Sequence, residues 1–280
     1  RGEGLLVLRG TDGLRNEGEL VNSGRITSEA PVVNVAGARF DNPGQLTAPS
    51  LRNHGTFIVG GPVTTTSDGV QNTGRLEIAR GGRLEAGGGY LQLVGGSGTP
   101  VTRVDGALAA TAGFVAISEG VLEGTGHVEG SLLLGGDPPD GPQALVRPGG
   151  RGAVGTLTAD VLGVGRAAFE IDIASAASFD QMAAPLGFWL REGEVHFRLL
   201  EGFVPAVGSQ FGWLATDPGF LPGSDLAGMR WTVTLVRADH SEWALGGSAG
   251  WDPQAPVRFS FDGVQLSVTA VPEPGTALML

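Results

Sequence analysis

A short phrase recurs five times between Leu14 and Leu76: an apolar residue, any residue, Asn, any residue, Gly, any residue and a second apolar residue. Asn and Gly most readily adopt positive φ, so each copy predicts a tight corner between two short strands. A unit of this size cannot bury its own apolar face and must stack on neighbouring units. The phrase therefore favours a β-solenoid. The copies are Leu14–Leu20, Leu20–Ile26, Phe40–Leu46, Leu51–Phe57 and Val70–Leu76.

The spacing of these Asn residues sets the size of the repeating unit. Asn22 and Asn42 are 20 residues apart, Asn53 and Asn72 are 19 apart, and Asn42 and Asn53 are 11 apart. A period near 20 matches one coil of a β-solenoid, with two Asn-Gly corners in some coils. We expect the Asn side chains to set corners and ladders and assign them no binding role. The apolar run Leu5–Leu8 predicts a buried strand.

Composition agrees with an all-β chain. There are 49 Gly and 17 Pro among 280 residues, about twice the usual share of these two residues. Apolar residues recur between the glycines throughout, so many short strands with tight turns explain the composition better than disorder. No segment of ten or more residues carries the 3.6-residue apolar stripe of a helix.

Charge and residue usage exclude several functional classes. The formal net charge is −11 and all 18 basic residues are Arg, so an acidic chain without a basic cluster is a poor candidate for binding nucleic acid or an anionic membrane. The absence of Lys excludes a Walker-type phosphate loop and a Schiff base. The absence of Cys excludes disulfides, thiolate nucleophiles and Cys-based metal sites. The sequence has no run of 18 or more apolar residues.

Two coils within residues 121–158 have a recognisable form. Val121–Leu132 resembles the L-x-G-x-G-x-V-x-G-x-V coil of autotransporter-type passenger domains. Ala144–Gly149 and Val154–Thr158 together resemble the coil that usually follows, with Gly135–Pro142 inserted as a protruding loop. We therefore expect a β-solenoid, as a right-handed parallel β-helix, over residues 1–165. Eight coils about 4.8 Å apart would make a rod roughly 40 Å long.

The strands after residue 165 are longer and more aromatic. Phe169–Ile173 alternates cleanly between apolar and acidic residues, and Phe179–Met182 resembles the Y-D-Q-L element of such passengers. We interpret residues 166–270 as a β-rich C-terminal cap or sandwich that closes the solenoid, as terminal repeats must.

The tail, residues 271–280, carries the most specific signal. It resembles the start of the PEP-CTERM sorting signal, in which Val-Pro-Glu-Pro precedes an apolar membrane helix and an Arg cluster. The resemblance implies an exported protein of a Gram-negative bacterium, processed by an exosortase-type enzyme and placed in the cell envelope, at the cell surface or in the extracellular matrix. Membrane contact is expected only through a helix beyond Leu280, before processing. The signal residues are Val271, Pro272, Glu273 and Pro274.

Two short motifs match enzyme fingerprints without their structural context. Gly150–Gly155 fits the dinucleotide motif G-x-G-x-x-G, with Asp172 downstream, but Thr156–Val161 reads as a strand where a helix is needed. Gly246–Gly250 fits the nucleophile elbow G-x-S-x-G, but neither a helix nor a His follows it. We expect no nucleotide site at the first place and a Gly/Ser turn at the second.

The four His residues show no metal-binding spacing. His54 and His127 lie in or beside Gly turns and are expected at a solvent edge. His196 shares a strand face with Arg198, and we expect both to be exposed. The fourth is His240. We predict no metal site, no cofactor and no catalytic residue.

Carboxylates and Trp residues carry the remaining possibilities. Glu170 and Asp172 lie on one strand face about 7 Å apart, a separation that glycoside hydrolysis permits, but we expect a solvated face. Asp137 and Asp140 in the inserted loop could bind Ca²⁺ through oxygen ligands, although the calcium-binding nonapeptide is absent. Packing of the cap explains most of the Trp residues, and one or two on an exposed edge could stack on sugar rings. These are Trp189, Trp213, Trp231, Trp243 and Trp251.

The sequence thus predicts an exported, non-enzymatic scaffold or adhesin, an elongated β-solenoid associated with exopolysaccharide. The alternative is a carbohydrate-active β-helix enzyme, either a polysaccharide lyase or a glycoside hydrolase. A cleft with two or more convergent carboxylates and Arg would favour the enzyme, and a face without convergent acids would favour the scaffold.

Overall fold

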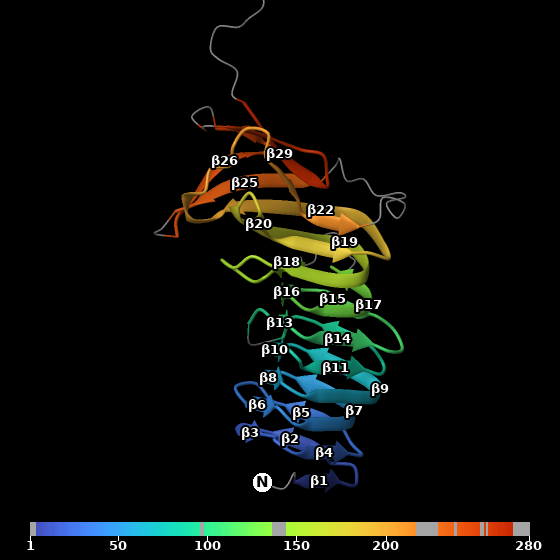
Figure 1. Cartoon of the computed structure of the whole chain (residues 1–280). Coiled ribbons are helices and arrows are strands. Elements are labelled where there is room, and N and C mark those ends of the chain that lie inside the picture. The colour runs from blue at the N-terminus through green and yellow to red at the C-terminus, as the bar shows by residue number, and fades with distance from the viewer. Residues whose placement is uncertain are drawn as a thin grey trace, which may run out of the picture.

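Successive segments of the chain wind in coils that stack directly on one another (Figure 1). The computed structural model describes residues 4–95, 98–135, 144–216, 229–237, 240–252, 255 and 257–270. Parallel strands pair from coil to coil in a β-solenoid of about 8 turns, followed by a small antiparallel sheet. The predicted all-β solenoid is confirmed, and the described part contains no α-helix.

Each coil places one strand, or one part of a bent strand, on each of three faces. The first face holds β1 (Leu5–Leu8), β4 (Arg25–Ser28), the first parts of β7 (Gln45–Asn53) and β9 (Pro62–Asn72), β11 (Arg83–Ala86), β14 (Ala107–Ala110) and the first part of β17 (His127–Leu134). The second face holds β2 (Leu14–Asn16), β5 (Val32–Asn34), the later parts of β7 and β9, β12 (Tyr90–Gln92), β15 (Val115–Ile117) and the later part of β17. The third face holds β3 (Glu19–Val21), β6 (Arg39–Asn42), β8 (Thr56–Val59), β10 (Arg75–Ile78), β13 (Val101–Val104), β16 (Gly120–Gly124) and β18 (Ala144–Pro148).

The core is a set of apolar columns inside the coils. Because side chains alternate along a strand, every second residue points inward, as in the alternating burial of β8 and β10. In-register pairing then stacks like positions, so that Phe40, Phe57 and Leu76 lie one above another with no exposed surface. The rings of Phe40 and Phe57 meet edge to face with their centroids 4.8 Å apart.

The glycines of the repeated phrase are needed for close stacking rather than for positive φ. None of them has a φ in the left-handed region, so the positive φ predicted for these glycines is wrong. A Cβ on Gly44 would lie 2.1 Å from the carbonyl oxygen of Gly24, and one on Gly74 would lie 2.2 Å from that of Gly55. Only glycine lets the corner of one coil sit so close to the corner of the coil before it.

A ladder of buried amides runs along the inside of the second face. Each Asn donates one Nδ2 proton to Oδ1 of the next rung, at 2.8 Å in three successive steps. The other Nδ2 proton goes to a backbone carbonyl oxygen at 2.9 Å. A shorter ladder joins Asn22 to Asn42 at a different corner of the same coils. The predicted ladders and double corners are confirmed, and the long ladder consists of Asn16, Asn34, Asn53, Asn72 and Gln92.

The strand predicted at Leu5–Leu8 exists as β1, but the expectation that it is buried was wrong. Leu5 is 66% exposed and Leu6 and Val7 are more than 40% exposed. Within the part of the chain that the structure describes, this strand pairs only with β4 of the following coil.

The parallel stack continues past residue 165. β19 (Thr156–Ser175) passes over all three faces, and β21 (Gln181–Ala184), β22 (Gly187–Leu199), β24 (Leu214–Thr216) and β25 (Arg230–Val236) extend them in parallel register. The predicted boundary between residues 165 and 166 lies within β19 and stays a prediction.

Antiparallel pairing closes the C-terminal end. β26 (Glu242–Gly247) pairs with β25 and with β27 (Gly250–Trp251), while β23 (Gln210–Gly212), β29 (Gln265–Thr269) and β28 (Arg258–Phe261) form the small separate sheet. The fully buried Trp213 packs on Phe169 below it and donates Nε1–H to the carbonyl oxygen of Gly263 at 3.0 Å. The hairpin β20 (Ser178–Phe179) and the short 3-10 turn η1 (Leu200–Gly202) complete the elements. Within the described residues no helix has the length and apolar character to cross a membrane.

Candidate functional site

The two enzyme-like motifs form turns, and the turn predicted at Gly246–Gly250 is confirmed. β19 begins at Thr156, directly after Gly150–Gly155, so the following segment is a strand and not a helix. Ser248 lies in the turn between β26 and β27, where its hydroxyl accepts a hydrogen bond from the backbone N–H of Trp231 at 2.9 Å. Neither motif has the strand-to-helix geometry that its chemistry requires.

The Gly-rich turn binds two carboxylates of the protein instead. The N–H of Gly152 donates to Oδ2 of Asp172 at 2.6 Å, and the N–H of Gly155 donates to Oδ1 of Asp180 at 2.7 Å. Gly152 and Asp172 are 20 residues apart, which is the length of one coil. This spacing brings the two residues next to each other on adjacent coils.

Arg198 organises a charge cluster at the C-terminal end of the third face. Its Nη1 lies 2.7 Å from Oδ1 of Asp172 and 3.1 Å from Oε1 of Glu170, and its Nε donates to Glu242 at 3.1 Å. Arg147 joins these residues by donating Nη2–H to Glu170 at 3.3 Å, and Arg151 lies beside Glu170 and Glu242. We call this group the C-terminal charge cluster; it consists of Arg147, Arg151, Glu170, Asp172, Arg198 and Glu242.

Two expectations about exposure were wrong in this cluster. Asp172 is 1% exposed and the side chain of Arg198 is 7% exposed, whereas the strand pattern predicted a solvated face. Partners from other parts of the chain enclose the two side chains: the N–H of Gly152 bonds Asp172, and Glu242 of β26 bonds Arg198. His196, on the same strand as Arg198, is partly exposed, as expected; its Nδ1 lies 2.8 Å from the Thr232 hydroxyl.

Asp180 is also fully buried, beside Asp172. Its Oδ2 accepts the N–H of Asp172 at 3.0 Å. Burial raises the pKa of Asp180 to about 8, although the backbone N–H groups of Asp172 and Gly155 favour its charged form. Burial likewise raises the pKa of Asp172 above its ordinary value, against the attraction of Arg198.

A cavity of about 750 Å³ opens next to the cluster. Its described lining contains one acid, Glu201, while the carboxylates of the C-terminal charge cluster do not line it. Trp243 contacts one of the lining residues, since the guanidinium of Arg237 lies 5.1 Å from the centroid of its ring. The described lining of this C-terminal cavity is Arg151, Gly152, Arg198, Leu200, Glu201, Val236, Arg237 and His240.

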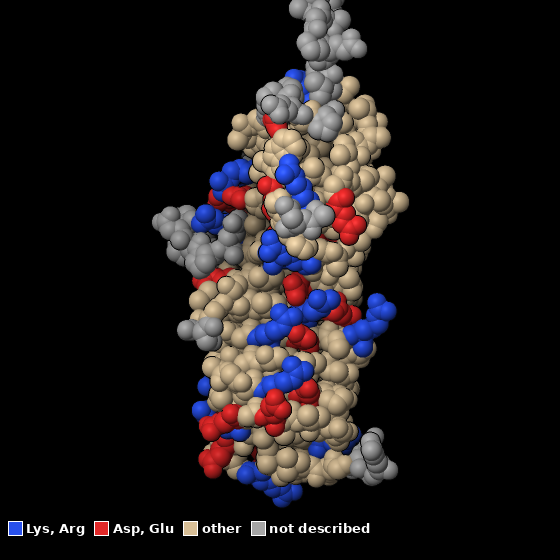
Figure 2. Space-filling model, turned by 90° about the vertical axis from the view of Figure 1, so that its left-hand side faces the viewer, with Lys and Arg blue, Asp and Glu red and all other residues tan. Residues whose placement is uncertain are grey.

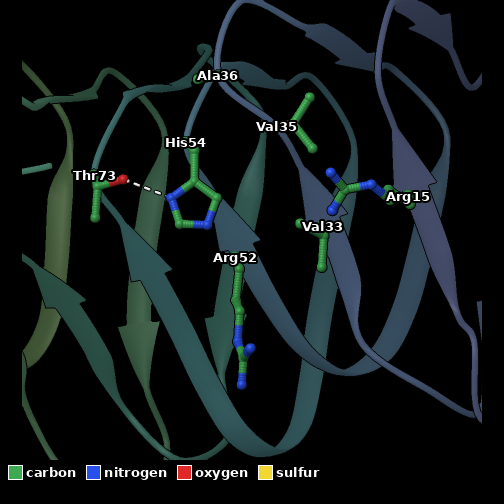
Figure 3. A pocket seen from close by; sticks show the side chains of 7 residues that line it. All are labelled: Arg15, Val33, Val35, Ala36, Arg52, His54 and Thr73. Atoms are coloured by element: carbon green, nitrogen blue, oxygen red, sulfur yellow. Dashed lines mark hydrogen bonds between the residues drawn. The ribbon is translucent and has the colours of Figure 1, made fainter. Parts of the chain in front are cut away.

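A second concave region, of about 530 Å³, lies near the N-terminal end of the second face. Figure 3 shows the guanidinium of Arg15 directed toward the side of the hollow where His54 lies, while the side chain of Arg52 points away from His54. The Nδ1 of His54 lies 2.7 Å from the hydroxyl of Thr73. Arg15 donates Nε–H to Glu17 at 2.6 Å, and Arg52 forms no ion pair with any described residue. We call this the second-face hollow; it is lined by Arg15, Val33, Val35, Ala36, Arg52, His54 and Thr73.

The third face carries a stripe of paired charges along the rod. Figure 2, which looks onto this face, shows acidic and basic side chains interleaved from coil to coil. Glu77, Arg103, Glu123 and Arg147 follow one another in register, and Arg103 bonds Asp105 at 2.6 Å. Each of these four side chains therefore has an oppositely charged neighbour.

The other predicted candidates are dispersed. His127 bonds Asp160 through Nε2 at 2.7 Å on the first face, and His240 is exposed at the C-terminal cavity. Trp189 is 46% exposed, Trp243 is 39% exposed, and Trp231 is partly buried. The described residues include no group of three or more His, Asp or Glu that is arranged to hold a metal ion. Outside the described residues lie Asp137, Asp140, the side chain of Trp251 and the signal residues Val271, Pro272, Glu273 and Pro274.

Sequence reasoning missed several residues. Asn34 is a ladder rung that lacks the repeated phrase, and Arg52 gave no signal beyond an isolated charge. The role of Arg198 depends on Glu242, 44 residues away, a contact that no local pattern encodes. A search against protein-family models, curated proteins and solved structures finds no match to this chain.

Proposed function

We propose that this chain is an exported, non-enzymatic scaffold or adhesin of a Gram-negative cell envelope, cell surface or extracellular matrix. One observation carries the proposal most strongly: the convergent carboxylates next to the C-terminal cavity are engaged by arginines and backbone N–H groups. A β-solenoid with such internally satisfied charges fits a mechanical role, as a rod that holds its polar surfaces at fixed spacing.

The alternative of a polysaccharide-cleaving enzyme rests on the same cluster. Two carboxylates and an arginine do converge there, since Arg198 contacts both Glu170 and Asp172. A general acid or base must reach the scissile bond, and Asp172 is buried while Glu170 is bound by Arg147 and Arg198. The cluster is therefore better suited to joining the last coils than to catalysis.

The sorting part of the proposal depends on the resemblance of residues 271–274 to the PEP-CTERM signal. The partner it implies is an exosortase-type processing enzyme, and the bound material is extracellular polysaccharide.

Turnover assays test the non-enzymatic part. The purified chain is incubated with a broad panel of neutral and acidic polysaccharides, and both reducing ends and unsaturated products are measured. We expect no turnover above a heat-denatured control. Turnover that is lost in Glu170→Gln would overturn the proposal and establish the enzyme.

Fractionation of a bacterium that carries the complete gene tests the sorting part. We expect the protein in envelope or matrix fractions, and retention in the cytoplasm would contradict it. Replacing Glu273 by Ala should cause the unprocessed protein to accumulate, whereas replacing the exposed Glu17 by Ala should leave processing unchanged.

A further inference from the structure

The outward side of the second face forms one continuous column of residues in parallel register. Each member pairs with the next across adjacent coils, from β2 through β22. No member is Asp or Glu, although the chain carries 29 acidic residues. The members of this acid-free column are Arg15, Val33, Arg52, Gln71, Leu91, Ala116, Leu133, Gly163 and Trp189.

The N-terminal end of the column presents positive charge through Arg52, since Arg15 is paired with Glu17. Arg15 and Arg52 are exposed, two coils apart, with Val33 between them, and both line the second-face hollow. Arg52 has no carboxylate partner among the described residues, in contrast to Arg103 and Arg147 on the third face. Because His54 uses Nδ1 toward Thr73, its other ring nitrogen remains for a ligand. This end can bind an anionic group.

The C-terminal end presents an aromatic platform. A Cβ on Gly163 would lie 2.6 Å from Nε1 and Cε2 of Trp189, so the indole lies against the backbone of the strand below it. With 46% of its surface exposed, Trp189 offers an aromatic surface to solvent. Flat, rigid aromatic surfaces of this kind stack on sugar rings and on bases.

The distance between the two ends sets the shape of the ligand. Arg52 and Trp189 are six register steps apart, about 29 Å at 4.8 Å per step. Between them Gln71, Leu91 and Leu133 are at least partly exposed and carry no charge, whereas Ala116 and Gly163 are buried, so the path has no opposing charge. Only an extended ligand lying along the rod would contact both ends.

Charge density decides between the extended polyanions. Nucleic acid binding requires many phosphate contacts, and this column supplies two arginines on a chain of net charge −11. A glycan with acidic groups on some of its rings needs only local neutralisation and also supplies a ring for Trp189. On these grounds we infer that the acid-free column binds an extended anionic polysaccharide parallel to the solenoid axis. The inference rests on the proposed function and names its ligand class and binding face.

Binding of the full chain to oligogalacturonates of increasing length tests the inference, with dissociation constants measured by calorimetry. Affinity should rise with length until the oligomer spans about 29 Å, and full methyl esterification should weaken binding about tenfold by removing the carboxylates. Dextran sulfate is the parallel probe for sulfate groups; the tighter of the two acidic glycans identifies the preferred anion.

Two variants locate the site. Arg52→Gln and Trp189→Ala should each weaken binding about tenfold, and neither residue belongs to the core. Arg9→Gln removes one exposed positive charge outside the column, and Trp243→Ala removes an exposed indole near the C-terminal cavity; both should bind like the original chain. Thermal melting of all four variants separates a binding defect from unfolding.

Four results would overturn the inference. They are no binding of any acidic glycan, binding by Arg52→Gln and Trp189→Ala as tight as that of the original chain, loss of binding only in Trp243→Ala, and tighter binding of an oligothymidylate or of phosphatidylserine vesicles. The first three leave the non-enzymatic role and the sorting intact, because those parts of the proposal stand on turnover and fractionation, although the first removes acidic glycans as the bound material. Turnover of a glycan bound at this face would instead remove the scaffold proposal and keep the binding face.

Discussion

The N-terminal and C-terminal coils fill the same inward position with chemically different side chains. At one inward position of the second face, the N-terminal coils place a ladder of amides and the C-terminal coils place a column of aliphatic side chains. Amides bond each coil to the next in a fixed register, whereas aliphatic residues stabilise by burial without direction. The position is occupied in turn by Asn16, Asn34, Asn53, Asn72, Gln92, Ile117, Leu134, Val164 and Leu190.

Gln92 makes the change from amide to aliphatic possible. It accepts from Asn72 at 3.3 Å, but its longer side chain donates Nε2–H to the backbone carbonyl oxygen of Glu119 at 2.7 Å and not to a further rung. Ile117 can therefore follow without leaving a buried amide unpaired. A ladder of this kind must end in a residue that reaches the backbone.

The two regions also differ in where they bury charge. In the described N-terminal coils the buried polar residues are neutral amides and hydroxyls, while the C-terminal coils bury Asp172, Asp180 and Arg198. Buried ions lose hydration and depend on their partners, so the C-terminal coils should be the more sensitive to loss of a single charge.

Arg198→Met should have the largest effect on stability. It leaves Asp172 buried without its cation and removes the link to Glu242, so we expect about 4 kcal/mol of destabilisation. Urea unfolding gives the free energy, and hydrogen exchange should place the loss in β19 and β22. Arg230→Met, in which the arginine is 64% exposed and pairs with Glu194, should cost less than about 1 kcal/mol. Equal effects of the two variants would contradict the role of the C-terminal charge cluster.

Asn53→Leu tests whether the ladder is more than a packing device. Leu is similar in size and is the residue that the C-terminal coils use at Leu134. The variant leaves the Nδ2 proton of Asn34 without its acceptor and removes a donor to the carbonyl oxygen of Arg75, which we expect to cost about 3 kcal/mol.

The matched control for this ladder variant is Leu134→Ile, a volume-conserving change in the same column that should cost less than about 1.5 kcal/mol. Urea unfolding of both variants, with hydrogen exchange of β5 and β9, gives the comparison. If Asn53→Leu were neutral, the ladder would contribute packing alone.

The same contrast explains how much the sequence could predict. The Asn-x-Gly phrase gave the solenoid, its period and the ladder, because each rung and each close corner requires one residue type. In the aliphatic coils the sequence shows only the alternation of apolar and polar residues. This pattern predicts strands but not which strands pair with one another. Arg198 and Asp172 looked like a solvated face because the residues that bond them, Gly152 and Glu242, are distant in sequence. Arg52 and Trp189 became a candidate site only when the register placed them on one column.

The pH dependence of stability should follow the C-terminal coils. The unfolded chain releases the proton of Asp180 near pH 4, while the folded chain keeps it to about pH 8. Between these values the folded state binds more protons, so its stability decreases as pH rises. We expect the loss from Asp180 to accumulate across this whole window.

Thermal melting from pH 4.5 to 8.5 measures this slope. Hydrogen exchange should show the pH-dependent loss of protection in the coils after β18, since the ladder amides do not titrate. Asp180→Asn removes the titrating group and should make the slope shallower, whatever its effect at a single pH. A slope unchanged by this substitution would assign the pH dependence to other groups.

Arg103→Met should have the smallest effect and completes the comparison with Arg198→Met. Both arginines are on the third face and both bond a carboxylate at 2.6–2.7 Å. The Arg103 side chain is 36% exposed against 7% for Arg198, so water already screens the contact with Asp105. We expect less than about 1 kcal/mol of destabilisation, and less still in 1 M NaCl, where the Debye length is about 3 Å.

The cost of Arg198→Met should persist in the same salt because its cluster is shielded from ions. Urea unfolding at low and high NaCl measures both, and a salt-independent loss at Arg103 would show that the stripe of paired charges stabilises the rod as the buried cluster does.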